Sequence, residues 1–314
     1  MSKNKDSTNL NRIAIIGCGH VGSTSAYALL LRGIAEELVV LDEDRKRLAG
    51  EVMDLQQCVP LNQPTRIWAG DFNDLDDADI IVIAAGAGTK PGESRLELLT
   101  RNVSVIREIV KEIKKTSFDG IILMTTNPVD ILAQAAQEES DLPVSQVISS
   151  GTVLDTARLR MILGEKLGIE ARSVHAYIIG EHGDSEIATW SSASVAGTPL
   201  FEFAGDLNLD FDEILEKVRK AAPKIVRQKG YTSFAIASSV VRICEAVLRD
   251  EKTVLPVSTL TTGQYGIEEI YLSLPCVVGR KGVEKVIEIP LSDDEKEGLK
   301  KSAEILKKTY RQIG

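Results

Sequence analysis

One stretch near the N-terminus, residues 12–42, constrains the fold of this chain more than any other. Four apolar residues, Ile13 to Ile16, lead into a glycine turn formed by Gly17, Gly19 and Gly22. A helical apolar pattern follows, and a second apolar run ends in Asp42, about 20 residues after the last glycine. This order of strand, glycine turn, helix, strand and acidic residue is typical of a dinucleotide-binding unit.

Each member of the stretch has its own physical task. Gly17 permits the tight turn out of the strand, Gly19 lets a pyrophosphate approach the backbone N–H groups at the helix start, and Gly22 allows close helix–strand packing. Val21, in the same turn, belongs to the expected cofactor-binding residues. Asp42 can accept hydrogen bonds from ribose hydroxyls and would repel a 2′-phosphate, so we expect NAD rather than NADP. Two alternatives are a glycine-turn α/β protein and a site for another nucleotide-containing ligand.

The composition excludes several other classes of protein. The chain has 314 residues, 43% of them apolar and 26% charged, which is typical of a globular protein with one large domain or two. A net charge of −9 argues against a general nucleic-acid surface. No apolar run approaches the roughly 20 residues that span a membrane, and the polar residues 1–11 lack the apolar core of a signal peptide. We therefore expect a cytoplasmic protein with a short frayed N-terminal arm.

The cysteines give no sign of a metal site or of a disulfide framework. They are far apart in the sequence and show no Cys-x-x-Cys or Cys/His ligand spacing: Cys18, Cys58, Cys244 and Cys276. We expect them to be reduced and structural, and we expect no metal.

Apolar runs alternate with helical patterns along the first 150 residues. Strands are expected at 13–16, 38–41, 65–69, 79–84, 120–126 and 146–150, with further helices at 43–58 and 96–113. The alternation predicts an α/β fold, a Rossmann-type doubly wound parallel sheet that binds its ligand beyond the carboxyl ends of the strands. Residues expected to contact the cofactor at these ends are Gly17, Asp42, Gly86, Asn127 and Ser150.

The pattern changes near Gly151. Helices are expected at 152–167, 207–229, 233–249 and 293–310, a strand at 174–179, and short alternating strands between 253 and 290. We therefore expect two domains, a NAD-binding domain at residues 1–150 and a mixed α+β substrate domain at residues 151–314. The sequence shows no repeat and no low-complexity linker, so the two should share one rigid interface.

His182 is the leading candidate for proton exchange. It lies in the loop Gly180-Glu181-His182-Gly183-Asp184, directly after a predicted strand, and histidine has an unperturbed pKa suited to proton transfer near neutrality. A loop histidine that only bonds to a neighbour is the alternative.

Asp155 and Arg158 are three residues apart on a predicted helix and therefore share a face. They form either an intrahelical ion pair of little consequence or a functional pair. In the second case Asp155 would orient His182, and Arg158 would bind a carboxylate with its planar guanidinium.

The segment around residues 85–97 is rich in glycine and polar residues and precedes a long predicted helix. Its composition fits a mobile lid that brings Arg95 over a bound substrate, or alternatively a solvated loop. Asn127 directly follows a strand, and the bond to the next residue, Pro128, is a candidate cis peptide.

Six motifs occur in order and at suitable separations over essentially the whole chain. They are GCGHVG, KPGESR, TTNPVD, SGTVLDTARLR, HAYIIGEHGD and KGYTSFAIA. With them the chain resembles the L-lactate/malate dehydrogenase family, and IIGEHGD and KGYTS bring it closer to the bacterial lactate branch. The resemblance implies a bilobal, homotetrameric NAD enzyme of glycolysis and fermentation. Such an enzyme transfers hydride between nicotinamide C4 and C2 of a small 2-keto or 2-hydroxy acid.

The resemblance also implies roles for the residues of the catalytic set. His182 would donate the proton to the forming alkoxide, and Asp155 would hold the imidazolium. Arg158 would bind the substrate carboxylate, while Arg95 would polarise the carbonyl once the lid closes. These charges would stabilise the negative charge that hydride transfer builds on oxygen.

Further roles follow for residues around this set. Asn127 would orient the carbonyl, Thr232 would line the substrate pocket, and Asp42 would hold the adenosine ribose.

Thr89 departs from the family pattern. It stands just before Lys-Pro-Gly, where lactate dehydrogenases typically have glutamine and malate dehydrogenases arginine, and it would face the substrate side chain. Threonine is short and uncharged, so we expect relaxed specificity, with pyruvate accepted, bulkier 2-keto acids tolerated and oxaloacetate a poor substrate.

A regulatory site is also implied by the resemblance. Arg160 and His175 occupy positions that bind fructose 1,6-bisphosphate at a subunit interface in activated bacterial relatives. Relatives without this control also carry such a histidine, which leaves activation open.

Three functions are therefore under consideration. A lactate-type NAD-dependent L-2-hydroxyacid dehydrogenase is expected, malate dehydrogenase is the alternative within the enzyme class, and a non-catalytic NAD-binding sensor is the alternative outside it.

Overall fold

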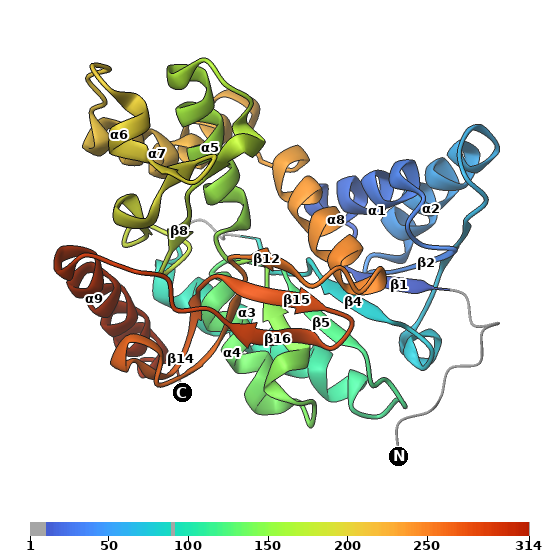
Figure 1. Cartoon of the computed structure of the whole chain (residues 1–314). Coiled ribbons are helices and arrows are strands. Elements are labelled where there is room, and N and C mark those ends of the chain that lie inside the picture. The colour runs from blue at the N-terminus through green and yellow to red at the C-terminus, as the bar shows by residue number, and fades with distance from the viewer. Residues whose placement is uncertain (1–10, 89–91, 314) are drawn as a thin grey trace.

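The computed structural model describes residues 11–88 and 92–313, which are organised around one large sheet (Figure 1). The sheet has eight strands in the order β14-β13-β6-β5-β4-β1-β2-β3. Their bounds are β1 (Arg12–Ile16), β2 (Glu37–Leu41), β3 (Arg66–Ala69), β4 (Ile80–Ile83), β5 (Ile121–Met124), β6 (Val147–Ser149), β13 (Ser258–Thr262) and β14 (Glu268–Ser273). Strands β1 to β6 are parallel, and the order reverses at β1, so the predicted doubly wound sheet is confirmed.

Helices cover both faces of this sheet. On one face lie α1 (His20–Arg32), α2 (Arg45–Cys58) and α8 (Phe234–Leu248), and on the other α3 (Arg95–Ile113) and α4 (Val129–Glu139) (Figure 1). Every residue of β2, β4 and β5 is buried, which explains why these strands are continuous apolar runs rather than alternating ones.

The ends of the first-half helices follow local signals in the sequence. Gly33 ends α1 in the left-handed conformation, with φ of 57°, and its N–H donates to the carbonyls of Leu29 and Leu30. Ser94 begins α3 with a capping box, in which the Glu97 N–H donates to the serine hydroxyl and the Ser94 N–H donates to the glutamate.

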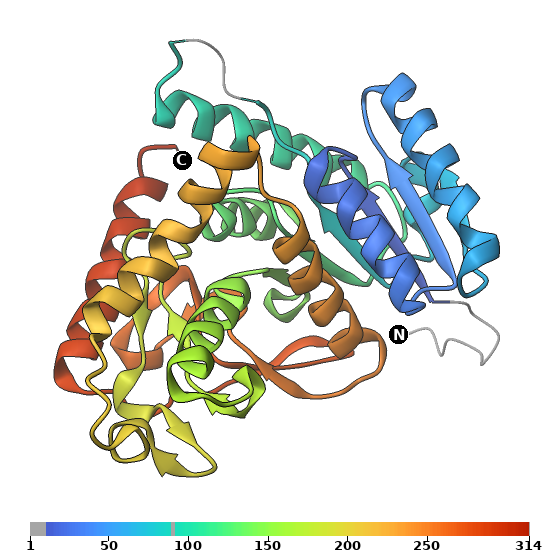
Figure 2. The ribbon, with the colours of Figure 1, turned by 90° about the horizontal axis from the view of Figure 1, so that it is seen from above.

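The second half of the chain builds several smaller units, which Figure 2 shows beside the sheet from above. Its helices are α5 (Val153–Leu167), α6 (Leu200–Ala204), α7 (Phe211–Lys229), α8 and α9 (Asp293–Tyr310). Its small sheets pair β7 (Val174–His175), β10 (Ser194–Val195) and β11 (Thr198–Pro199); β8 (Ile178–Ile179) and β9 (Ile187–Ala188); and β12 (Thr253–Leu255), β15 (Cys276–Gly279) and β16 (Gly282–Val286). Short 3₁₀ turns occur at Val59–Leu61, Phe72–Leu75, Val144–Gln146, Ala171–Ser173, Trp190–Ser192 and Gln264–Gly266.

Three details differ from the expectation. The strand predicted at 174–179 is two short strands in different sheets, because β7 pairs with β10 whereas β8 pairs with β9. Helix α7 begins at Phe211 rather than at residue 207, because the Asp210 carboxylate caps it by accepting the Glu213 N–H. Helices α4 and α6 and strands β9 to β11 are additional to the expected elements.

Strands from the second half also join the main sheet. β13 pairs with β6 and β14 with β13, both antiparallel, and α8 packs on α1 beside them. An ion pair of 2.8 Å between Arg32 of α1 and the buried Glu245 of α8 closes this contact. The two halves of the chain therefore share one hydrophobic core around the sheet.

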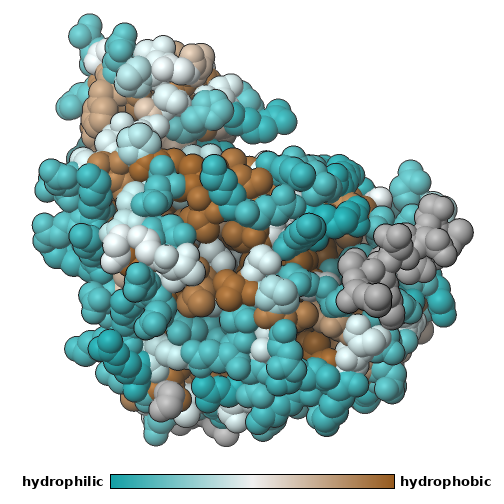
Figure 3. Space-filling model, turned by 60° about the horizontal axis from the view of Figure 1, so that its bottom comes forward, coloured by the Kyte–Doolittle hydropathy of each residue, from teal (hydrophilic) through white to brown (hydrophobic). Residues whose placement is uncertain are grey.

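A second, smaller core lies where α5 packs against α7. Its members include Leu159, Leu163, Val174, Ile178, Ile214 and Val218, all completely buried. On the face shown in Figure 3, hydrophilic side chains cover most of the surface and hydrophobic ones lie in patches between them. Within the described residues, no helix is both long enough and apolar enough to cross a membrane.

Candidate active site

The glycine turn between β1 and α1 shows which glycines the fold itself requires. Gly17 has a φ of 99°, and a Cβ there would lie 2.5 Å from the backbone nitrogen of Ala85. A Cβ at Gly22 would lie 1.8 Å from the Gly17 carbonyl oxygen. At Gly19, by contrast, a Cβ would meet no atom within 4 Å. The space beside Gly19 is therefore open, at the N-terminus of α1, where backbone N–H groups favour an anion such as a pyrophosphate.

Asp42, which follows β2, is hydrogen-bonded to this turn. Its carboxylate accepts the Cys18 N–H at 2.7 Å and the Asp44 N–H at 2.9 Å. Burial raises the pKa of this carboxyl, but the two backbone donors and Arg47 outweigh it and hold the pKa below its usual value. Asp42 is thus an anion at neutral pH, at the end of β2, and each oxygen retains acceptor capacity for a ribose hydroxyl. These residues fit a dinucleotide without a 2′-phosphate.

Cys18 inside the turn is fully buried. Burial and the neighbouring Asp42 raise the pKa of its thiol to about 12, which keeps it protonated and unreactive.

The remaining predicted cofactor residues lie along the same edge of the sheet. Gly86 follows β4, and a Cβ there would lie 2.6 Å from Cγ2 of Thr126. Asn127 follows β5, is exposed, and precedes Pro128 through a cis peptide bond. Ser150 follows β6 and is buried, with its N–H bonded to the Met124 carbonyl at 2.9 Å. Val21 is half-buried at the start of α1.

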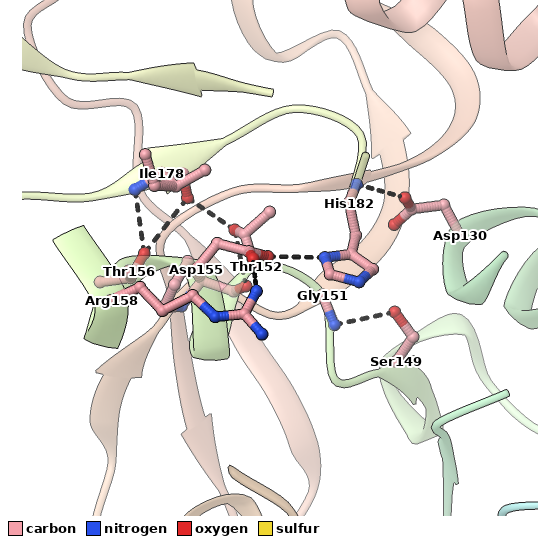
Figure 4. Close-up of polar contacts among 10 residues, drawn as sticks. Asp130, Ser149, Gly151, Thr152, Asp155, Thr156, Arg158, Ile178 and His182 are labelled. Carbon is pink, nitrogen blue, oxygen red and sulfur yellow. Dashed lines mark hydrogen bonds and ion pairs between the residues drawn. The ribbon is translucent and has the colours of Figure 1, made fainter. Parts of the chain in front are cut away.

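A second cluster, from the other half of the chain, contains His182, Asp155 and Arg158 (Figure 4). Nδ1 of His182 lies 2.6 Å from Oδ2 of Asp155, and NH1 of Arg158 lies 2.8 Å from Oδ1 of the same carboxylate. One carboxylate therefore serves the imidazole and the guanidinium at once, and the intrahelical ion pair does not prevent Asp155 from orienting His182. With Nδ1 committed to Asp155, Nε2 of the ring remains available to a ligand.

The charges in this cluster stabilise one another. Burial lowers the pKa of His182, but the Asp155 carboxylate and its hydrogen bond outweigh this and raise the pKa to about 9. Burial likewise raises the pKa of Asp155, and the two neighbouring cations bring it below the usual value. Asp155 is only 3% exposed, whereas the His182 side chain is 23% exposed. The histidine is therefore an imidazolium at neutral pH, partly accessible and held by a buried anion.

The helix and loop that carry these groups are joined by Thr152, the N-cap of α5, and by Thr156 within α5. The Thr152 hydroxyl donates to the Ile178 carbonyl at 2.6 Å, and the Thr156 hydroxyl accepts the Ile178 N–H at 2.9 Å (Figure 4). These bonds tie β8 to the first turn of α5. Because His182 follows β8 by three residues, they set its distance from Asp155.

The loop of His182 is also held by residues that the sequence did not single out. The His182 N–H donates to Oδ2 of Asp130 on α4 at 2.8 Å (Figure 4), and the Glu181 N–H donates to Ser302 on α9 at 2.8 Å. Asp130 is 2% exposed, and burial raises the pKa of its carboxyl to about 6. The sequence signal for Asp130 is its position three residues after Asn127, in the motif TTNPVD.

Glu186 is a second buried acid near His182 that the sequence analysis does not single out. It stands four residues after His182 and is 2% exposed, and its Oε1 has no hydrogen-bond partner among the described residues. One ligand atom each from Glu186, Asp155 and His182 lie within 4.8 Å of one another. By distance this trio could hold a divalent cation, but the Arg158 guanidinium already bonded to Asp155 opposes a second cation there.

Two other predicted substrate residues lie outside this bonded cluster. Arg95 is exposed at the start of α3, and among the contacts of the described chain none joins it to His182. Thr232 is half-buried in the link between α7 and α8, next to Tyr231, whose ring stacks on His20 of the glycine turn at 3.7 Å. The link between α7 and α8 therefore packs against the glycine turn. Thr89 lies outside the described residues, as do residues 1–10 of the expected N-terminal arm.

The predicted regulatory pair lies on the far side of α5. Nε of Arg160 donates to the Ala176 carbonyl at 2.9 Å, and the guanidinium lies over the Tyr177 ring at 4.9 Å. His175 is exposed on β7. Both positions are thus on adjacent elements, β7 and α5.

Comparison with family models matches nearly the whole chain. The lactate/malate dehydrogenase NAD-binding domain matches residues 11–149, and the lactate/malate dehydrogenase alpha/beta C-terminal domain matches residues 152–313.

Individual proteins match over similar lengths. An L-lactate dehydrogenase of Clostridium perfringens (strain SM101) is 46% identical over 302 residues, 95% of each chain, and one of Synechococcus sp. (strain JA-3-3Ab) is 46% identical over 96% of this chain and 98% of its own. Among solved structures, a lactate dehydrogenase named MGS-M5 from a Medee basin deep-sea metagenome library superposes with a TM-score of 0.94 at 40% identity, covering 96% of this chain and 98% of its own. The minor L-lactate dehydrogenase of Enterococcus mundtii gives 0.94 at 38% identity, covering 97% and 98%.

Proposed function

Because the chain belongs to the lactate/malate dehydrogenase family, we propose that it is an L-lactate dehydrogenase, which interconverts pyruvate and L-lactate. Its cofactor is NAD, which supplies or accepts the hydride when bound. The single observation that carries the proposal is the bonded set His182, Asp155 and Arg158, because it combines a proton donor with a cation suited to a carboxylate.

The chemistry of this set matches reduction of a 2-keto acid. Hydride addition to the ketone builds negative charge on oxygen, and Nε2 of the His182 imidazolium is the group that protonates it. Asp155 keeps the ring charged and oriented through Nδ1. Arg158 retains guanidinium donors that Asp155 does not use, and these bind the substrate carboxylate in a planar, bidentate manner. In the reverse direction the neutral imidazole accepts the proton.

Three further residues complete the proposed substrate site. Arg95, exposed at the start of α3, reaches the substrate carbonyl when the 85–97 segment closes, and water exclusion then strengthens its charge. Asn127 and Thr232 contact the substrate from the sheet edge and from the α7–α8 link. The proposed division into a NAD-binding domain, residues 1–150, and a substrate domain, residues 151–314, agrees with the ends of the two family models.

Substitution of the histidine separates catalysis from cofactor binding. His182→Ala is expected to lower kcat for pyruvate by at least about 1,000-fold, because the alkoxide loses its proton donor, while NADH affinity measured by fluorescence stays within about twofold. Unchanged turnover would refute the role of His182. Wild-type protein that binds NADH but reduces no 2-keto acid would support a non-catalytic NAD-binding sensor instead.

Specificity is proposed to be relaxed because of Thr89. A panel of pyruvate, 2-ketoisocaproate and oxaloacetate tests this, with pyruvate expected to have the highest kcat/KM, the bulkier acid to be accepted, and oxaloacetate to be poor because no second cation is supplied at this position. Thr89→Gln should narrow the panel towards pyruvate. Oxaloacetate as the best substrate would favour malate dehydrogenase.

Activation by fructose 1,6-bisphosphate is proposed for the Arg160 and His175 positions. The guanidinium of Arg160 and the exposed ring of His175 offer phosphate donors on adjacent elements. Titration of the sugar bisphosphate should lower the pyruvate concentration at half-maximal rate, and Arg160→Gln should abolish the effect. An unchanged midpoint at every pH would remove the proposal.

The remaining proposals concern the oligomeric state and the cellular compartment. We propose a homotetramer, supported by large apolar side chains that are exposed in the single chain, such as Leu61, Met161 and Phe201. We propose a cytoplasmic role in glycolysis and fermentation; the four cysteines, all free and three of them buried, fit a reducing compartment. Sedimentation of the purified protein tests the first of these.

A further inference from the structure

Glu186 is a buried carboxyl group that the proposed reaction leaves without a task. It is 2% exposed, and Oε1 is buried without a hydrogen-bond partner in the part of the chain that the structure describes. An ionised carboxylate in such a position would lose its hydration without a compensating partner, which is strongly unfavourable. The geometry alone therefore favours the protonated, neutral form of this side chain.

The surroundings of Glu186 contain both signs of charge. Helix α5 contributes Asp155 and Arg158. A carboxylate oxygen of Asp155 lies within 4.8 Å of a carboxylate oxygen of Glu186. The loop contributes His182, and α7 contributes Arg219, whose guanidinium donates to the Glu186 backbone carbonyl. Asp130 on α4 accepts the His182 N–H.

These neighbours act in opposite directions on the pKa of Glu186. Burial raises its pKa first, and the Asp155 carboxylate raises it further, whereas His182 and the two arginines lower it. The net pKa is about 8. The pKa of His182 is raised to about 9, so the two groups lose their protons over adjacent pH ranges. The charge of each group therefore shifts the pKa of the other.

We propose that Glu186 is a positioning residue that controls the charge of His182. Near neutral pH its carboxyl is neutral and leaves the pair of His182 and Asp155 undisturbed. At alkaline pH it ionises, and its negative charge then holds the imidazolium that keto-acid reduction needs. The inference rests on the proposed function for its kinetic consequence only, because the charge coupling itself can be measured without turnover.

The coupling is measured on the histidine ring. The chain contains three histidines, so ¹³C-labelled histidine side chains give three NMR titrations, which His20→Gln and His175→Gln assign. In Glu186→Gln the amide matches the neutral carboxyl in shape but cannot ionise. We expect the His182 titration midpoint to fall by about one pH unit, because a charge at this distance is lost above the Glu186 midpoint.

The kinetic readout should show the same displacement. For Glu186→Gln, kcat/KM for pyruvate is expected to stay within about twofold of wild type at pH 6.5, and its alkaline limb to begin about one pH unit lower. Glu186→Asp, which keeps an ionisable group, should restore part of the displacement. Glu245→Gln is the matched control, since it removes a buried carboxylate on α8 and should leave the histidine midpoint and the pH profile unchanged.

A test on the wild-type protein guards against a variant that fails to fold. The infrared spectrum at pH 7 should contain the carbonyl stretch of a protonated carboxyl group, and this band should disappear as the pH rises towards 9.5. Asp130, with a pKa of about 6, is largely ionised at pH 7 and so contributes little to it.

Distinct results would overturn the inference. A His182 midpoint in Glu186→Gln equal to that of wild type, or no protonated carboxyl at pH 7, refutes the coupling. An equal loss of activity at every pH indicates a purely structural role and also refutes it. Absence of 2-keto acid reduction by wild-type protein refutes the proposed function instead, and leaves the NMR and infrared results to decide the coupling.

Discussion

The cofactor turn and the catalytic cluster represent two ways of building a site. In the turn, Gly17, Gly19, Gly22 and Asp42 come from one strand–helix–strand unit, and Gly17 also packs against the backbone of Ala85, which follows β4. In the cluster, Asp155 and Arg158 belong to α5, His182 to a loop after β8, and Asp130 to α4. The turn depends on local backbone geometry, whereas the cluster depends on how four segments pack.

The difference predicts different responses to mutation. A change in the turn acts through shape, because the limiting contacts are between backbone atoms. A change in the cluster acts through charge, because one buried carboxylate holds two cations. Substitutions that add volume should therefore be most damaging at the glycines of the first region, and substitutions that remove a charge should be most damaging in the second.

The largest effect is expected for Asp155→Asn. The amide preserves the volume but loses the charge that holds the His182 imidazolium, and it cannot pair fully with Arg158. We expect kcat/KM for pyruvate to fall roughly 1,000-fold, with NADH affinity unchanged within about twofold. Steady-state kinetics and fluorescence titration measure the two quantities. If kcat/KM falls by less than about tenfold, the carboxylate does not control the protonation of His182.

The matched pair Gly22→Ala and Gly19→Ala tests the turn. At Gly22 the added Cβ would lie 1.8 Å from a carbonyl oxygen, so the turn must shift, and we expect a loss of about 3 kcal/mol in stability together with weakened NADH binding. At Gly19 the Cβ meets no protein atom within 4 Å. That variant should keep the wild-type melting temperature and bind NADH roughly tenfold more weakly, because the methyl group enters the space proposed for the pyrophosphate.

Thermal denaturation and NADH titration of both variants decide the comparison. Equal destabilisation of the two would show that Gly19 is required by the fold rather than by the ligand. Unchanged NADH affinity in Gly19→Ala would place the pyrophosphate elsewhere.

The smallest effect is the pH dependence of stability that the cluster imposes. His182 has a folded pKa of about 9 against an unfolded value of 6.5, so it binds a proton more tightly when folded. Its stabilisation is complete below pH 6.5 and is lost as the pH rises towards 9. We measure the free energy of unfolding with urea at pH 6 and at pH 9.5. The difference between the two values is expected to be smaller in His182→Gln than in wild type by on the order of 2 kcal/mol.

Glu186 adds to this slope with the same sign. Its folded pKa of about 8 lies above the ordinary value of 4.5, so the unfolded chain ionises first and folding becomes less favourable between those values. Glu186→Gln should therefore be more stable than wild type at pH 8 and equal to it near pH 4. Identical stability differences at both pH values would contradict the protonated state of this carboxyl.

Much of the first region could be predicted from the sequence. The helix end at Gly33, the strands leading to Gly17 and Asp42, and the start of α3 at Ser94 all follow signals within a few residues. Helix α4 is not among the predicted elements. Its polar residues Asp130, Gln134 and Glu138 recur every four positions, but the first two are buried, and their burial depends on packing that the local sequence does not show. The strand at 174–179 was misjudged because pairing partners, which the local sequence does not contain, divide it.

The catalytic set was predicted only as candidates with alternatives. Spacing on α5 placed Asp155 and Arg158 on one face, but it could not tell whether the carboxylate serves the arginine or the histidine. The structure shows that it serves both. Asp130 and Glu186 were not foreseen, because burial distinguishes them from the many acidic residues at the surface and burial is a property of the packed chain.

The sequence by itself therefore determined the parallel sheet, the glycine turn and the family, because these depend on short-range backbone geometry and on motifs of adjacent residues. Only the tertiary structure decided the electrostatics of the site. Contacts between α4, α5 and the loop after β8 remove Asp155, Asp130 and Glu186 from water, and the strength of a charge interaction depends on that removal more than on which residues are present.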